Sequence, residues 1–234
     1  MPAAQAKKPP RTVDGPSALQ QLVWKAVPVY CGGGRRRLVA LTFDDGPGPW
    51  TLTLAAALRH VHAPATFFVV GSRIQFWPEG ARADARAGVL GNHTWSHPHL
   101  RRLKPGDVRS ELWRTQVQVV ETTRQLPAVF RPPYEQANRR IDRIAKTLNM
   151  VDVRWNVDSG DAARGATPAA VVSTVLAQAR PGAIVLMHDL HPWSGAAAAA
   201  IVLGLRARHL RPVTVPTLLE LDPPRQLAGG DRCG

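Results

Sequence analysis

The feature that most constrains the fold of this chain is an alternation of short, apolar, β-prone runs with longer runs of helical periodicity. This order is typical of a mainly parallel sheet covered by helices. The predicted strands are 38–43, 65–70, 128–133, 151–157, 183–189 and 212–215. The predicted helices are 51–61, 109–126, 139–150, 168–180 and 195–210. With 234 residues, 44% of them hydrophobic, the chain is long enough for one α/β domain with a sizeable core.

Composition changes on both sides of this region, which we assign to a domain over 37–222. Residues 1–36 begin rich in Pro, Ala and Lys and are predicted to be a lead-in segment, in which 17–30 forms a short helix or an irregular packing segment. Residues 223–234 are predicted to be a C-terminal tail. The first 30 residues lack the basic start and apolar block of a secretory leader, as a mature exported chain also would.

The formal net charge of +13 predicts attraction to anionic partners. We find no helix-turn-helix, zinc-finger or RNA-binding signature, so nucleic acid is not expected as a partner. An anionic cell-surface polymer, a membrane surface and a solvated basic surface without a partner remain as alternatives. No apolar stretch reaches the roughly 20 residues of a membrane span.

The chain has two cysteines, Cys31 and Cys233, which flank the predicted domain. Their separation excludes a metal knuckle. They are either two thiols or one bridge that ties the tail to the start of the domain, and we favour the bridge.

Ionisable residues recur where the apolar strands end. Because the carboxyl ends of parallel strands meet at one edge of a sheet, we expect these side chains to form one site. They are Asp44, Asp45, Arg131, Tyr134, Asp158, His188 and Asp189.

Two histidines four residues apart, His93 and His97, add a second indication. On a helical turn their rings would face the same way, and such a pair chelates one divalent ion. Taken alone, the spacing also fits two ordinary surface histidines. Together with one of the two neighbouring aspartates, however, the pair completes the three protein ligands of a catalytic zinc site. The other aspartate is then left to take a proton from an activated water.

Five motifs in order resemble those of the NodB-homology polysaccharide deacetylases (carbohydrate esterase family four). They are TFDDGP at 42–47, HTWSH at 93–97, RPPY at 131–134, DSGDA at 158–162 and LMHD at 186–189. The resemblance implies a distorted (β/α) barrel of about seven parallel strands. It also implies one bound divalent ion, with zinc expected and cobalt or another divalent ion as the alternative.

The resemblance also implies roles in catalysis. Asp44 would be the general base and His188 the general acid that protonates the leaving group. The implied metal ligands are Asp45, His93 and His97.

The remaining implied roles concern support and substrate. Arg131 would orient the general base, and Asp158 would sit behind Arg131 or the general acid. The backbone amide of Tyr134 would help to hold the oxyanion, and Leu186 would line the pocket for the acetyl methyl group.

Two positions depart from the family pattern. The fourth motif ends in Ala162 where the family usually has Trp, so Trp155 or Trp193 is expected to fill in as a wall, or the groove is more open. The third motif is followed by Glu135 where the family usually has Gly. Neither change removes a metal ligand or a proton-transfer group.

The expected activity is removal of N-acetyl groups from N-acetylglucosamine units of β-1,4-linked polysaccharides, either peptidoglycan-type glycans or chitin oligomers. An O-acetyl xylan esterase and a non-catalytic wall-binding module are the alternatives. We expect a monomer that is secreted or held at the cell envelope, with a cytoplasmic location as the alternative.

Overall fold

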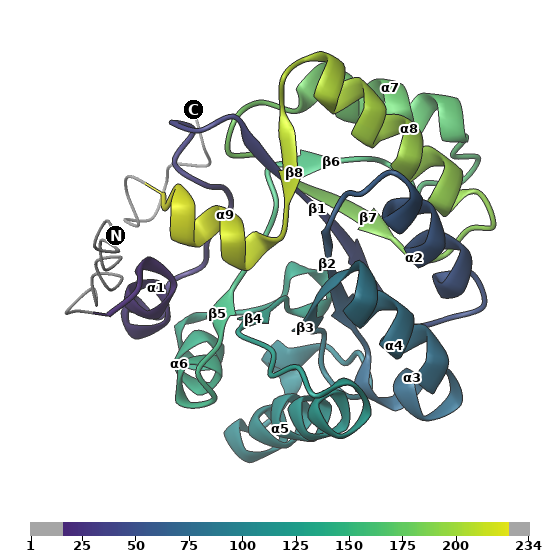
Figure 1. Ribbon diagram of the computed structural model, residues 1–234. Helices are drawn as coiled ribbons and strands as arrows, with labels where there is room; N and C mark the ends of the chain where they lie inside the picture. The colour runs from purple at the N-terminus through teal and green to yellow at the C-terminus, as the bar shows by residue number, and fades with distance from the viewer. Residues whose placement is uncertain (1–15, 225–234) are drawn as a thin grey trace, which may run out of the picture.

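The structure, a computed structural model, describes residues 16–224 and is built around a curved parallel sheet (Figure 1). The strands are β1 (Leu38–Asp44), β2 (Ala65–Val69), β3 (Gly88–Asn92), β4 (Val129–Phe130), β5 (Val151–Asp152), β6 (Val157–Asp158), β7 (Ile184–His188) and β8 (Arg211–Val213). The α-helices are α1 (Ala18–Lys25), α2 (Thr51–His60), α3 (Gly71–Phe76), α4 (Pro78–Ala87), α5 (Pro105–Thr123), α6 (Arg139–Thr147), α7 (Pro168–Gln178), α8 (Ser194–Ala207) and α9 (Val215–Leu221). Two 3₁₀ turns, η1 (Leu100–Arg102) and η2 (Pro133–Glu135), complete the set.

The sheet confirms the predicted barrel-like architecture. Seven strands follow the order β5-β4-β3-β2-β1-β7-β6, β8 pairs with β1, and every pairing is parallel. β5 and β6 lie at opposite ends of this path, yet only residues 153–156 separate them in the chain. So short a connection requires the sheet to curl until its two ends approach each other.

The outer face of the sheet is covered by helices, as Figure 1 shows. Alternate residues of β1 point to this face and pack against apolar residues of α2, α7 and α8. These β1 residues are Val39, Leu41 and Phe43, each exposed by 1% or less.

The inner face is apolar at one end of the strands and polar at the other. Leu38 and Ala40 share a core cluster with residues of α1 and α9, which cap that end of the barrel. Further along the same face of β1 come Thr42 and Asp44, both buried. β1 therefore places the carboxylate of Asp44 at the open end of the barrel, while α1 and α9 cover the other end.

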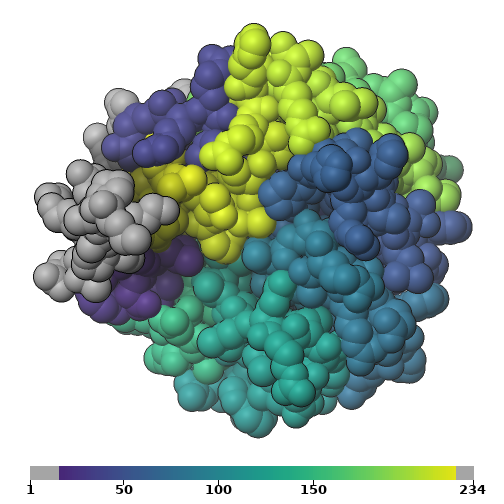
Figure 2. Space-filling view, in the orientation of Figure 1, coloured from purple at the N-terminus to yellow at the C-terminus, as the bar shows by residue number. Residues whose placement is uncertain are grey.

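The segments at the two ends of the described chain lie side by side (Figure 2). Glu220 of α9 accepts hydrogen bonds from the backbone N–H groups of Ala18 and Leu19 in α1. Of the two alternatives for 17–30, the short helix is the one present, as α1, and it packs onto the domain. Cys233 lies outside the described residues, so its bridge to Cys31 stays a prediction. No helix in the described range is long and apolar enough to cross a membrane.

Three elements differ from the sequence-based predictions. Residues 71–92, to which we assign no element, form α3, α4 and β3. The predicted strand 151–157 is two short strands, because Val153 leaves the sheet path and bridges to Val29. The predicted strand 212–215 ends early, since Thr214 instead caps α9 with its hydroxyl oxygen.

Candidate active site

Most of the polar residues predicted at the strand ends gather at one edge of the sheet, whereas Asp158 and Asp189 make contacts outside the site, with Gly160 and Thr51. Asp44 is the last residue of β1 and His188 the last residue of β7, and the two are direct register partners. Arg131 follows β4, and His93 follows β3. The parallel arrangement therefore assembles, from four strands, side chains that are far apart in the sequence.

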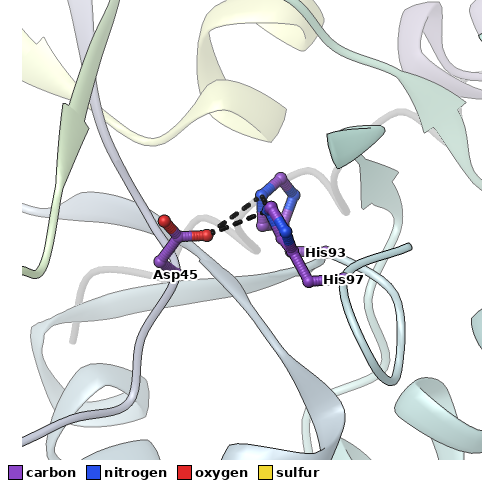
Figure 3. A group of neighbouring side chains, drawn as sticks. All are labelled: Asp45, His93 and His97. Carbon is purple, nitrogen blue, oxygen red and sulfur yellow. Dashed lines mark hydrogen bonds and ion pairs between the residues drawn. The ribbon is translucent and has the colours of Figure 1, made fainter. Parts of the chain in front are cut away.

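Three side chains converge as a potential metal site, with Asp45 facing the two imidazoles (Figure 3). Oδ1 of Asp45 lies 3.2 Å from Nε2 of His97 and 3.5 Å from Nε2 of His93. The two Nε2 atoms are 3.2 Å apart. The three ligand atoms all lie within 4.8 Å of one another, which is the donor set and the spacing that a single divalent ion requires.

The hydrogen bonds of the imidazoles suit metal binding. Nδ1 of His93 donates to the carbonyl oxygen of Arg131 at 2.8 Å, which fixes the tautomer that leaves Nε2 with a lone pair. Nδ1 of His97 lies 3.1 Å from the hydroxyl of Tyr134. Both rings thus turn Nε2 toward Asp45, and the residues present fit a divalent ion.

The histidine pair is brought together by a loop and not by the expected helical turn. Residues 93–99 are non-helical, and Thr94 and His97 have positive φ values of 68° and 57°. The hydroxyl of Thr94 accepts the backbone N–H of His97, which closes a tight turn. The carboxylate of Glu111 accepts the backbone N–H groups of the two residues between Thr94 and His97, which are Trp95 and Ser96. The rings meet because this turn reverses the chain, so the i, i+4 prediction was right about proximity and wrong about its cause.

Asp44 and Asp45 diverge as the sequence predicts for neighbours at a strand end. Asp44 is 4% exposed, and its Oδ1 accepts a hydrogen bond from Nη1 of Arg131 at 2.8 Å. Asp45 has a φ of 71°, which turns its carboxylate to the histidines. Burial alone would raise the pKa of Asp45, but hydrogen bonds and electrostatic attraction from His93 and His97 hold it well below its ordinary value.

Arg131 is fully buried and holds Asp44 from behind. Its guanidinium also donates to the hydroxyl of Thr42 and to the carbonyl oxygens of Val153 and Arg154. Burial lowers the pKa of Arg131, and the charge of Asp44 opposes that change. The predicted pairing of Arg131 with Asp44 is present.

His188 is supported by Asp161, which corrects the prediction for Asp158. Nδ1 of His188 lies 2.8 Å from Oδ1 of Asp161, whose carboxylate is buried. Asp158 is exposed, and its carboxylate instead accepts the backbone N–H of Gly160. Burial lowers the pKa of His188, but Asp161 and the carboxylates of Asp44 and Asp45 raise it to about 9.

Tyr134 and Leu186 have surroundings that suit a pocket. Tyr134 has a φ of 55°, and its N–H has no hydrogen-bond acceptor among the described residues. Leu186 precedes His188 by two residues in β7, so both side chains project from the same face of the sheet.

The two aromatic residues expected to form a wall are both half-buried, and their contact with substrate stays a prediction. Trp155 is half-buried, 5.4 Å from the guanidinium carbon of Arg131, and packs against the inner core. Trp193 stacks on His191 at 4.3 Å and packs against the outer core. Ala162 is exposed.

Several supporting residues were missed from the sequence. Asp161, Glu111 and His191 all hold segments of the site, the last through Nε2 to the carbonyl oxygen of Asp161 at 2.9 Å. Asp161 lies within the fourth motif, three residues after Asp158, and the motif does not indicate which of the two aspartates supports His188. Nothing in the local sequence around Glu111 signals its contact with a loop 15 residues earlier.

Comparison with known proteins places the chain beside carbohydrate deacetylases. Residues 32–153 match the family model described as polysaccharide deacetylase. The chitooligosaccharide deacetylase of Bradyrhizobium sp. (strain ANU 289) is 38% identical over 67% of this chain and 72% of that protein. Other matched relatives, from Bacillus subtilis and Listeria monocytogenes, are longer, and the chain spans only 40% and 38% of their length.

Solved structures share the fold. The Bc1960 peptidoglycan N-acetylglucosamine deacetylase has a TM-score of 0.79 at 28% identity, covering 88% of this chain and 98% of that one. BA3943 from Bacillus anthracis, described as a CE4 family pseudoenzyme, has a TM-score of 0.78 at 27% identity, covering 86% and 71%. Because one fold includes an enzyme and a pseudoenzyme, activity depends on individual side chains and not on the fold.

Proposed function

This chain belongs to the polysaccharide deacetylase family, and on that premise we propose that it is a metal-dependent hydrolase. Its proposed reaction removes N-acetyl groups from N-acetylglucosamine units of β-1,4-linked polysaccharides. The observation that carries the proposal is the position of two proton-transfer candidates, Asp44 and His188, as direct neighbours across β1 and β7 beside a three-ligand cluster.

The proposed metal ligands are Asp45, His93 and His97, and zinc is the proposed ion. Two imidazole nitrogens and one carboxylate oxygen are typical of a catalytic zinc site, which keeps an open position. A divalent ion held there would lower the pKa of a water molecule and polarise the acetyl carbonyl.

Asp44 is the proposed general base. Its Oδ1 is engaged by Arg131, while Oδ2 lies 3.9 Å from Nε2 of His93 and so faces the ligand cluster. Oδ2 is therefore the atom that takes the proton from the attacking water. The ion pair with Arg131 fixes the orientation of the carboxylate, which general-base catalysis requires.

His188 is the proposed general acid. An amide is cleaved slowly unless its nitrogen is protonated as it leaves, and His188 carries a proton at neutral pH because its pKa is raised to about 9. Nδ1 is bound to Asp161, so Nε2 is the nitrogen that gives the proton to the departing amine.

The acetyl group is proposed to bind between Tyr134 and Leu186. The N–H of Tyr134 donates to the developing oxyanion, and a preorganised amide of this kind typically contributes about 10²–10³ in rate. Leu186, beside His188 on the same strand, contacts the methyl group. Exposed Ala162 leaves that side of the groove open for a substituted or branched glycan.

The substrate proposed is a wall-type glycan, peptidoglycan or chitin oligomers, encountered by a secreted or envelope-bound monomer. The test is acetate release from peptidoglycan, chitin oligomers and acetylated xylan by the wild type and the Asp44→Asn variant. We expect N-acetyl glycans to be deacetylated only by wild-type protein. Acetylated xylan as by far the best substrate would favour the ester alternative, and no release from any substrate would favour a non-catalytic wall-binding module.

A further inference from the structure

The turn that carries Tyr134 contains two consecutive residues in a conformation that L-amino acids rarely adopt. Tyr134 has φ 55° and Glu135 has φ 57°. Only glycine adopts positive φ at little cost, and neither residue is glycine. This turn therefore needs support from elsewhere in the molecule to remain the favoured conformation.

The guanidinium of Arg154 supplies that support. Its Nη1 donates to the carbonyl oxygen of Glu135 at 2.8 Å and lies 3.5 Å from the carboxylate of the same residue. Arg154 is 5% exposed, so little water reaches its guanidinium, whereas the side chain of Glu135 is 45% exposed. The contact reaches the backbone of the residue that is in the left-handed conformation.

Arg154 is itself fixed in place by several contacts. Its Nε and Nη2 bind both carboxylate oxygens of Asp152, at 2.7 and 2.9 Å, in a bidentate pair. Its backbone N–H donates to Val29, and its carbonyl oxygen accepts from Nη2 of Arg131. The side chain thus reaches Glu135 from a rigid base, while the backbone of the same residue supports Arg131.

The neighbouring charges leave this ion pair intact at neutral pH. Burial would lower the pKa of Arg154, but Asp152 and Glu135 raise it above its ordinary value. Asp142 of α6 faces the same pair, and burial together with the charge of Asp152 raises its pKa to about 8. The raised pKa weakens the competition of Asp142 for the guanidinium, which Asp152 holds through two hydrogen bonds.

We propose that Arg154 is a positioning residue that holds Tyr134 and Glu135 in their left-handed conformation and thereby aligns Tyr134 with His97. The hydroxyl of Tyr134 is 3.1 Å from Nδ1 of His97, and its ring stacks on His99 at 4.3 Å. The inference rests on the proposed function for its catalytic consequence. Its structural part, the support of a proposed metal ligand through the turn, is measured without any substrate.

The test is a double-mutant cycle of Arg154→Lys and Glu135→Gly. Lysine keeps the charge beside Asp152 but cannot pair with it through two nitrogens while also donating to Glu135. Glycine removes the conformational cost of the turn. The readouts are zinc affinity, by competition with a chromophoric chelator, and amide hydrogen exchange of residues 131–138. Arg109→Lys, at an exposed arginine bound to Thr147, is the matched control.

We expect Arg154→Lys to weaken zinc binding about tenfold, the low end for loss of support behind a metal ligand. It should also speed exchange in the turn, while Glu135→Gly alone changes zinc affinity little. In the double variant, zinc affinity should return to within about threefold of the wild type. Wild-type affinity in Arg154→Lys, or a double variant as weak as Arg154→Lys, would overturn the inference.

Two additions keep the test decisive. If Arg154→Lys does not fold, the zinc affinities of Glu135→Gly and Glu135→Val are compared. The Glu135→Val protein should bind zinc more weakly, because a β-branched residue tolerates positive φ poorly. Equal zinc affinities of these two variants would also overturn the inference. If the cycle behaves as expected and no glycan is deacetylated, the positioning role stands and the proposed function fails.

Discussion

The carboxylate of Asp161 forms two hydrogen bonds with His188. Oδ1 lies 2.8 Å from Nδ1 of the imidazole, and Oδ2 accepts the backbone N–H of the same residue at 2.6 Å. Two contacts from one buried carboxylate fix both the position of the ring and the identity of the nitrogen that is left free. They also make the protonated imidazole more stable than it would be in water.

The pH dependence of deacetylation should report this contact. The pKa of His188 is raised from 6.5 to about 9, so the acid is protonated below that value and is lost as pH rises through it. In Asp161→Asn the charge of Asp161 is gone while those of Asp44 and Asp45 remain, so the alkaline limb of kcat/KM should move down by about one unit. Asp158→Asn is the matched control and should leave the limb in place. An unmoved limb in Asp161→Asn would remove Asp161 from this role.

Replacement of Asp44 should separate catalysis from metal binding. Asp44→Asn keeps an oxygen that accepts from Arg131 but cannot take a proton, so we expect turnover to fall about 10²–10⁴-fold. Alanine would be a poorer probe, because an unpaired buried guanidinium costs about 3–5 kcal/mol in stability. Metal content and the unfolding midpoint are measured on the same sample. Turnover within threefold of the wild type would exclude Asp44 as the base.

Removal of either proposed imidazole ligand should sharply reduce the amount of bound metal. We expect His93→Ala and His97→Ala to lower zinc occupancy and activity by orders of magnitude, since each removes one of three protein ligands. His60→Ala, at an exposed residue that ends α2, should keep full occupancy. Elemental analysis after dialysis gives the occupancy. Stoichiometric zinc in a His93→Ala/His97→Ala double variant would refute the ligand set.

Much of the site could be predicted because its residues lie at the ends of strands. β1 and β7 are continuous apolar runs, so their ends, and with them Asp44 and His188, follow from the sequence. β3 could not be found in this way, because Gly88 and Gly91 interrupt its apolar pattern. Both glycines are required by close packing: a Cβ at Gly88 would lie 2.0 Å from a carbonyl oxygen of β2.

The choice between Asp158 and Asp161 needed three-dimensional information. Asp158 is the last residue of β6 and Asp161 lies three residues later, and either could have turned toward His188. The carboxylate of Asp158 caps a local turn at Gly160, which has φ 74°, and this turn directs Asp161 back to the imidazole. Propensity alone does not distinguish the two, since either aspartate could hydrogen-bond the backbone of a local turn.

The two cysteines should be joined in the folded protein. The bridge would close a loop of about 200 residues and, by the chain-entropy model, add on the order of 5 kcal/mol of stability. Intact mass after alkylation without reductant gives the answer. We expect neither Cys31 nor Cys233 to be modified until reductant is added, and two alkylated thiols in native protein would refute the bridge.

Activity on an anionic wall glycan should depend on salt. The chain carries a formal charge of +13, and opposite charge raises the rate of association with an anionic polymer. At 0.15 M salt, interactions beyond about 8 Å are largely screened. We therefore expect kcat/KM on peptidoglycan that carries anionic polymer to fall several-fold between 0.02 and about 0.3 M salt. A neutral chitin oligomer is the control. Because it carries no charge, the positive protein does not attract it over long distances, and its kcat/KM should change little with salt. A parallel fall on both substrates would mean that salt acts on the site itself, and the proposed role of the positive surface would be wrong.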